Sequence, residues 1–308
     1  MSFLILIIGF AFLIKGADVF VEGASSLAKK FNVPSMIIGL TIVAMGTSAP
    51  EAAVSVTSSL AGQNDMSVAN VVVGVSSIIA KLPVQKDTIK KDTPFLILIS
   101  VLLLVFGVNL KLGRIEGLAL LALFTYFLVN TIKSAKKATE NEFLETGETA
   151  VAIEIETSSE ISLLKTILVS IIGIIGIVIG GDMVVNSATS IATSFGMSAN
   201  LVGLTIVAVG TSLPEFVTSI VAIKKGETEI AIGNVIGSNL FNILLVLGLA
   251  AVINPISMSM LAFIDIVFMV LITLLLYMFM KKRNSLVKKQ GIVLVVLYMA
   301  YMTYTIIR

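Results

Sequence analysis

The chain has 308 residues, of which 57% are hydrophobic and only 13% charged, and its formal net charge is +2. A soluble domain cannot bury that much apolar surface, so the composition predicts a membrane protein. The absence of Cys and His excludes disulfides and thiol chemistry and removes the commonest transition-metal ligand. The apolar run from Phe3 has no basic segment before it and no cleavage site after it. We therefore expect a first transmembrane helix, not a removable signal.

Ten apolar spans are expected along the chain, at 2–28, 34–61, 66–80, 93–110, 113–133, 163–193, 199–224, 229–253, 258–280 and 288–307. A Glu-rich polar segment divides them five and five. We predict an all-α polytopic membrane protein with an N-terminal five-helix repeat at 1–133, an acidic cytoplasmic linker at 134–162 and a C-terminal five-helix repeat at 163–308. A regulatory ion-binding loop is the alternative interpretation of the linker.

The basic residues orient these spans. With the N-terminus outside, the inner loops hold most of the 21 Lys and Arg residues, while the outer segments hold Lys111, Arg114 and Arg308. The positive-inside rule therefore predicts a multi-pass protein of the cell membrane with both termini outside. Because each half has an odd number of spans, the two halves would be inserted in opposite directions.

The two halves are also repeats of each other. Residues 31–51 parallel residues 195–215, and the letters GLTIVA are identical in both segments at an offset of 164. Inverted repeats with interrupted helices are typical of secondary transporters, whose ion sites lie between the repeats near the middle of the bilayer.

The repeated motif is GTSAPE at 46–51 and GTSLPE at 210–215. Pro50 and Pro214 each break a helix, which predicts free carbonyls one turn earlier, around Ala44 and Ala208. On a helix the hydroxyls lie three and four residues before the carboxylate and share its face. The two copies thus present Thr47, Ser48, Glu51, Thr211, Ser212 and Glu215.

These groups are hard oxygen ligands, which suit Ca²⁺ and Na⁺ and not a soft metal. A charged side chain at the bilayer centre costs roughly 2.5–3.5 kcal/mol on insertion scales, so two matched glutamates indicate a compensating cation. The alternative is a kinked helix with protonated glutamates and internally bonded hydroxyls.

A second polar pattern lies in GNVIGSNLFNILLVLG at 233–248. Asn234, Ser238 and Asn242 fall on one helical stripe, whereas Asn239 falls off it. Gly233 and Gly237 would let this helix pack closely against the broken helix. We interpret the stripe as cation ligands; hydrogen bonding between helices is the alternative.

At these motifs the sequence resembles the calcium/cation antiporter superfamily, in particular the prokaryotic Na⁺/Ca²⁺ exchangers, over nearly the whole chain. The resemblance implies antiport of Na⁺ and Ca²⁺ by alternating access, with spans one and six sliding over the other eight. It implies no enzyme activity, cofactor, nucleic acid or obligate protein partner, and a lipid bilayer as the surroundings. The implied ion ligands are Glu51, Glu215, Thr47, Ser48, Thr211, Ser212, Ala44, Ala208, Ser238 and Asn242.

Three departures from the family pattern matter. The proton-coupled branch carries a Glu near GNVIGSN; none is present here, which favours Na⁺ as the driving ion. Asn242 stands where several relatives have Asp, which leaves less negative charge. Asn70 matches Asn234 at an offset of 164, but Gly74 and later positions match at 174, so ten residues are missing after Val72.

The gap removes the first-half equivalent of GSNxxN and shortens the third span. Three explanations are open: an error in the sequence, a natural deletion that impairs transport, or a shortened helix that brings Ser76 or Ser77 into the site. A non-transporting paralogue is therefore an alternative function. A remote one is an intramembrane aspartyl protease built on Asp18 and Asp182.

Overall fold

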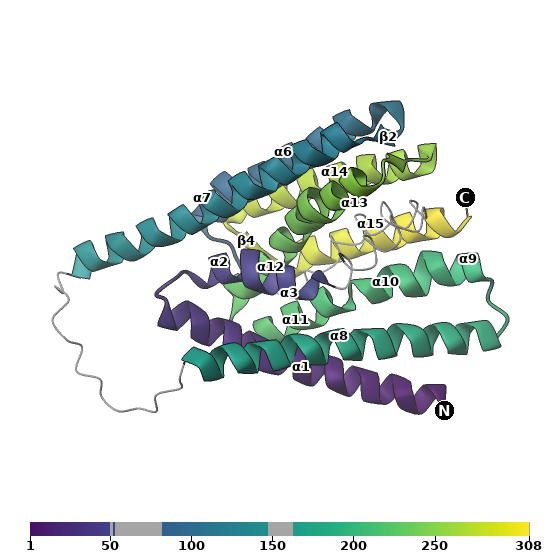
Figure 1. The fold of residues 1–308 in the computed structure, drawn as a ribbon, viewed down its shortest axis with the longest axis horizontal. Coiled ribbons are helices and arrows are strands. Elements are labelled where there is room, and N and C mark those ends of the chain that lie inside the picture. Colours follow the sequence, from purple (N-terminus) through teal and green to yellow (C-terminus); the bar gives the residue numbers. More distant parts are fainter. Residues whose placement is uncertain (50–51, 53–81, 147–162, 308) are drawn as a thin grey trace.

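A computed structural model of the chain describes residues 1–49, 52, 82–146 and 163–307 (Figure 1). Within these residues seven helices are long and apolar enough to cross a membrane, or eight if one bent pair counts as a span. The predicted span at 66–80, the second part of the span at 34–61 and the ten-residue gap after Val72 lie outside the described residues.

The long helices follow the predicted spans closely, because each span is a continuous apolar run that must satisfy its backbone hydrogen bonds internally. Their bounds are α1 Ser2–Lys30, α6 Thr93–Phe106, α7 Arg114–Thr146, α8 Leu163–Ser194, α12 Thr228–Phe241, α13 Gly248–Ile253, α14 Met260–Arg283 and α15 Lys288–Ile307. A π-helical segment, η3 (Thr88–Asp92), leads into α6, η4 (Gly107–Asn109) follows it, and η6 (Asn242–Leu247) joins α12 to α13.

The fifth predicted span, 113–133, agrees with a membrane-length apolar segment at Arg114–Lys137, and its helix runs further. Helix α7 does not end at 133 but continues to Thr146, into the segment expected to be linker. Adding residues to an existing helix needs no new nucleation, so a polar sequence can extend a membrane helix into water.

Helices α1 and α8 form an antiparallel pair along one side of the molecule (Figure 1). Glycines let their backbones touch. A Cβ atom built at Gly16 would lie 2.6 Å from the Ile177 amide nitrogen, and one at Gly180 would lie 2.4 Å from that of Leu13. Close backbone approach at small residues is how membrane helices associate without a hydrophobic driving force.

This contact predicts different outcomes at two neighbouring glycines. Gly180→Ala should lower the melting temperature of the purified protein, because its methyl group would overlap backbone, at a typical overpacking cost of about 1–3 kcal/mol. Gly181→Ala should be tolerated, because its Cβ would lie 3.5 Å from the Pro214 Cγ atom. Equal melting temperatures for the two variants would contradict the packing described.

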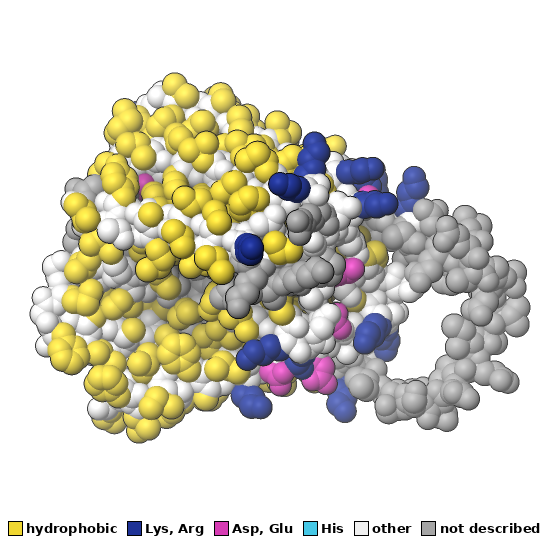
Figure 2. All heavy atoms as spheres, turned by 180° about the vertical axis from the view of Figure 1, so that it is seen from behind, with side chains coloured by type: hydrophobic (Ala, Val, Ile, Leu, Met, Phe, Trp, Pro, Cys, Tyr) yellow, Lys and Arg dark blue, Asp and Glu magenta, His cyan; other side chains and the backbone are white. Residues whose placement is uncertain are grey.

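The outer surface is that of a membrane protein. Large apolar side chains of the long helices are exposed, among them Phe3, Leu98, Ile172 and Leu271. Figure 2 shows hydrophobic side chains covering much of the flank of the molecule, whereas Lys and Arg side chains gather toward one end. In Figure 1 both chain ends lie at the opposite end of the molecule from the last turn of α7 and the first turn of α8.

Two short antiparallel strand pairs form between the segments that connect the helices. Strand β1 (Leu82–Pro83) pairs with β4 (Ser285–Leu286), and β2 (Lys111–Leu112) pairs with β3 (Ile256–Ser257). Residues 82 and 256 are 174 apart, and so are 111 and 285. An exchange of the two halves therefore converts one strand pair into the other.

Backbone conformation repeats in the same way. Leu110 and Asn284 both have positive φ, at 57° and 48°, and are again 174 apart. Asn32 and Gly196, at 50° and 86°, are 164 apart instead. The described parts of the two halves therefore change offset from 164 to 174 between 32 and 82, the interval that contains the expected gap.

Candidate cation site

Both copies of the repeated motif interrupt a helix at the same residue. In the first half α2 (Ser35–Ile38), η1 (Gly39–Val43) and α3 (Ala44–Thr47) end at Ser48, with φ −87° and ψ 3°. In the second half α9 (Ala199–Val202), η5 (Gly203–Val207) and α10 (Ala208–Thr211) end at Ser212, with φ −90° and ψ 1°. The chain then bends by 47° into α11 (Leu213–Lys224), as Pro214 predicts.

The motif is preceded in both halves by a π-helical segment with the letters GLTIV. The sequence analysis did not predict this wider turn, although the letters are identical in the two halves. Such π-helical turns are rare and are often found at functional sites.

Helix α12 packs directly on the first interrupted helix, as its glycines predict. A Cβ atom at Gly233 would lie 2.6 Å from the Met36 carbonyl oxygen, and one at Gly237 would lie 2.5 Å from that of Leu40. The stripe residues Asn234, Ser238 and Asn242 are thereby buried, each less than a tenth exposed.

A ring of hydrogen bonds joins the two halves at this contact. Ser48 Oγ donates to Glu215 Oε1 at 2.7 Å, and Thr47 Oγ1 lies 3.1 Å from Asn234 Oδ1. Asn234 Nδ2 in turn donates to the Glu215 carbonyl oxygen at 3.2 Å and to Ser219 Oγ at 3.0 Å. The Ser48 hydroxyl of the first motif thus meets the carboxylate of the second motif inside the molecule.

The carbonyl of Ala44 is not left without a partner, contrary to the argument from Pro50. It accepts from the Ser48 amide at 3.0 Å and lies 3.3 Å from Thr47 Oγ1. In the second half the Ser212 amide donates to the Val209 carbonyl at 3.2 Å. The two motifs therefore share a backbone bend and differ in their hydrogen bonds.

Two buried oxygens, one on α11 and one at the start of η6, have no hydrogen-bond partner among the described residues. They are the amide oxygen of Asn242 and the hydroxyl of Thr218, one turn after Glu215. A buried oxygen without a donor is costly unless a cation or water satisfies it. The sequence analysis named Asn242 and missed Thr218, whose repeat counterpart is Val54.

The structure shows fewer contacts for the remaining predicted ligands. Ser238 is buried and donates to the Val235 carbonyl at 3.2 Å. Thr211 and Ser212 are half-buried at the end of α10. Pro50 and Glu51 lie outside the described residues, so the second carboxylate stays a prediction.

Asn234 was predicted as a ligand only as part of the polar stripe and is not in the set that the family resemblance implies, and Ser219 was not predicted at all. A signal for each was present in the sequence: Asn234 heads the polar stripe, and Ser219 recurs as Ser55 in the first half at the 164 offset. Both side chains are buried. Their role depends on contacts between different helices, which a pattern within one helix does not contain.

A cluster of charged residues links the C-terminal half of α1 to the turn between α11 and α12. Lys225 Nζ lies 3.0 Å from an Asp18 carboxylate oxygen and 3.4 Å from one of Glu22, and Ser25 bonds Glu227 nearby. Partial burial lowers the pKa of Lys225, but hydrogen bonds and charges of the two acids raise it by more, so the net shift is upward. Lys225 is therefore charged at neutral pH.

The two aspartates of the protease alternative are not arranged for catalysis. Asp182 is exposed on α8, two residues after Gly180, which packs against Leu13. Asp18 lies five residues further along α1, so at about 1.5 Å per residue the carboxylates are roughly 10 Å apart along the antiparallel pair. They cannot share a proton as a catalytic dyad must.

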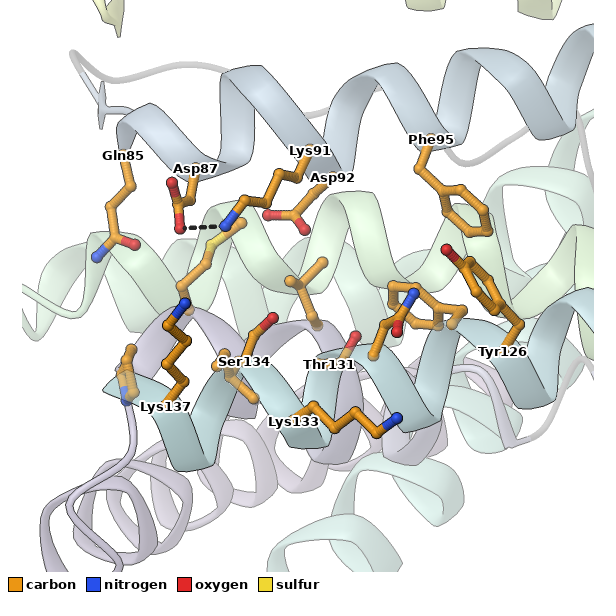
Figure 3. Close-up of a pocket in the computed structure, with 16 residues that line it drawn as sticks. Gln85, Asp87, Lys91, Asp92, Phe95, Tyr126, Thr131, Lys133, Ser134 and Lys137 are labelled. Atoms are coloured by element: carbon orange, nitrogen blue, oxygen red, sulfur yellow. Dashed lines mark hydrogen bonds and ion pairs between the residues drawn. The ribbon is translucent and has the colours of Figure 1, made fainter. Parts of the chain in front are cut away.

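A cavity of about 490 Å³ lies beside α2, η3, α6 and α7 (Figure 3). Lys91, Lys133 and Lys137 line it together with Asp87 and Asp92, and Lys91 pairs with Asp87 at 3.0 Å. The excess of positive charge disfavours a cation, and none of the ring residues lines it. The ring is therefore the candidate cation site.

Comparison with known proteins agrees with this geometry. A family model described as "Sodium/calcium exchanger protein" matches residues 1–133 and 165–307. The chain belongs to the sodium/calcium exchanger family. Among relatives of this family, sodium/calcium exchanger MaX1 of Methanosarcina acetivorans is 31% identical, with 98% of this chain and 97% of MaX1 covered. Inner membrane protein YrbG of Escherichia coli is 35% identical, covering 82% of this chain and 79% of YrbG.

The solved structure of the sodium-calcium exchanger NCX_Mj matches with a TM-score of 0.82 and 28% identity. The match covers 99% of this chain and 98% of that one. The chain is therefore a multi-pass membrane protein with the fold of this exchanger, and it is a transporter and not an enzyme.

Proposed function

We propose that this exchanger carries Ca²⁺ against Na⁺ by alternating access, with the ions bound between two inverted five-helix repeats. The observation that carries the proposal is the bond from Ser48 to Glu215, which joins the two motifs across the halves. Ligands shared between two halves let a relative movement of the halves open and close the site.

The proposed ligands are the oxygens of Thr47, Ser48, Glu215 and Asn242, with the carbonyls of Ala44 and Ala208. Repeat symmetry and family resemblance add four further proposed ligands: Thr211, Ser212, Glu51 and Ser238. Since Ser48 contacts Glu215, the same symmetry expects Ser212 to contact Glu51. Two carboxylates would balance the charge of one divalent cation, and no cofactor is required.

The strand pairs and positive-φ residues that match between halves support the inverted repeat. The pairing of α1 with α8 supports movement of these two helices as one unit over the rest. The concentration of Lys and Arg at the end opposite the termini supports both termini outside (Figure 2).

The orientation is testable because the chain has no Cys. Ser2→Cys should react with a membrane-impermeant maleimide in intact cells, and Lys282→Cys only after permeabilisation. The reverse pattern would overturn the proposed orientation.

Transport is tested in liposomes loaded with Na⁺ and diluted into Na⁺-free buffer that contains radioactive Ca²⁺. We expect Ca²⁺ uptake that stops when the Na⁺ gradient is collapsed. Uptake that persists without Na⁺ but follows a pH gradient would identify H⁺ as the driving ion. That result would contradict the preference for Na⁺ inferred from the absence of a Glu in GNVIGSN.

A non-transporting paralogue is the second candidate, and the missing ten residues favour it. Such a protein would keep the fold and the ring between Thr47, Asn234 and Glu215 but would carry no Ca²⁺ under either gradient.

A further inference from the structure

We propose that Asn234 is a positioning residue that accepts the hydrogen bond of the Thr47 hydroxyl and so leaves the Ala44 carbonyl available to a cation. This proposal rests on the proposed exchange function. It assigns Asn234 a role other than that of a ligand, although the residue lies on the same stripe as Ser238 and Asn242.

The orientation of the Asn234 amide is determined by its neighbours. Its Nδ2 faces two oxygens, the Glu215 carbonyl at 3.2 Å and Ser219 Oγ at 3.0 Å. A backbone carbonyl can only accept, so the NH₂ end of the amide must point toward Glu215. Oδ1 is then directed at Thr47, where it can only accept.

Thr47 has one hydroxyl proton and three acceptors within reach. They are Asn234 Oδ1 at 3.1 Å, the Val43 carbonyl at 3.1 Å and the Ala44 carbonyl at 3.3 Å. The Ala44 carbonyl already accepts the Ser48 amide at 3.0 Å. A carbonyl oxygen has two lone pairs, so a second bond from Thr47 would occupy the one that a cation needs.

Asn234 resolves this competition. When Thr47 donates to Asn234, the lone pairs of the Thr47 oxygen and the second lone pair of Ala44 remain for an ion. Asn234 itself has no exposed surface and its polar atoms are engaged, so it has little capacity left to act as a ligand. The backbone contacts of Gly233 and Gly237 with η1 hold α12 at the distance this arrangement needs.

The test is a double-mutant cycle on purified protein, read by equilibrium Ca²⁺ binding in a calorimeter and by melting temperature. Asn234→Ala should weaken Ca²⁺ binding roughly 10-fold, the scale of one lost hydrogen bond. In a Thr47→Val background the same change should have almost no further effect, because no hydroxyl proton is left to direct. Ser219→Ala, which removes one of two acceptors from the amide, should cause a smaller loss.

A matched cycle with Asn242→Ala is the control. Asn242 lies eight residues further along the helix, about 12 Å at 1.5 Å per residue, so the two losses should multiply independently. If Asn234→Ala and Thr47→Val are also independent, or if Asn234→Ala lowers only the melting temperature, the positioning role is wrong. If the parent chain binds no Ca²⁺, the proposed function itself fails and this role with it.

Discussion

Glu215→Gln should abolish Na⁺-driven Ca²⁺ uptake while the protein remains folded. Glutamine keeps the shape of the side chain and an oxygen that accepts from Ser48, so the contact between halves at 2.7 Å can persist. What it removes is the charge. Two unit charges 4 Å apart interact by about 4 kcal/mol at an effective dielectric constant of 20, so we expect Ca²⁺ binding weakened at least 100-fold.

Asp182→Asn is the matched control for this experiment. It also neutralises one carboxylate of a membrane helix, but Asp182 is exposed on α8 and outside the ring. We expect uptake equal to that of the parent chain. Loss of uptake in Asp182→Asn with normal uptake in Glu215→Gln would overturn the assignment of the site.

Restoring the missing ten residues should raise Ca²⁺ uptake above that of the parent chain, to that of a complete exchanger. The insertion, copied from residues 237–246 and placed after Val72, returns the Ser and Asn residues of GSNLFN and lengthens the third span. That span has about 15 apolar residues, roughly 22 Å of helix against a hydrocarbon core of about 30 Å.

The described residues indicate where the third span would pack. Helix α12 of the second half packs against Gly39 of the first half. A Cβ atom built at Gly39 would lie 2.7 Å from the Ile230 carbonyl oxygen. Gly203 is the repeat counterpart of Gly39, and no described residue comes within 4 Å of a Cβ built on it. By repeat symmetry we expect a third span to belong beside Gly203.

A control insertion separates length from ligands. The same ten residues with Ser and Asn changed to Ala should lengthen the span without restoring uptake. Equal uptake by the parent chain and the restored chain would mean that the shortened helix builds a site of its own. No uptake by either would favour the non-transporting paralogue.

Local sequence patterns were enough for the membrane class, the positions of the long helices and the motifs of the candidate cation site. They were enough because apolar runs and proline breaks are local: backbone hydrogen bonds in lipid must be closed within each segment. The 164-residue repeat further indicated that the two motifs would meet, because repeat-related halves of such transporters enclose their site.

The tertiary structure decided which atoms meet. The bond between Ser48 and Glu215 joins residues 167 positions apart, and the link between Thr47 and Asn234 joins residues 187 apart. Such contacts depend on how closely glycine faces let helices approach, and helical periodicity says which face a residue occupies but not what lies opposite. For the same reason the contacts of Asn234 with Thr47 and Glu215 could be seen only with α12 packed against η1.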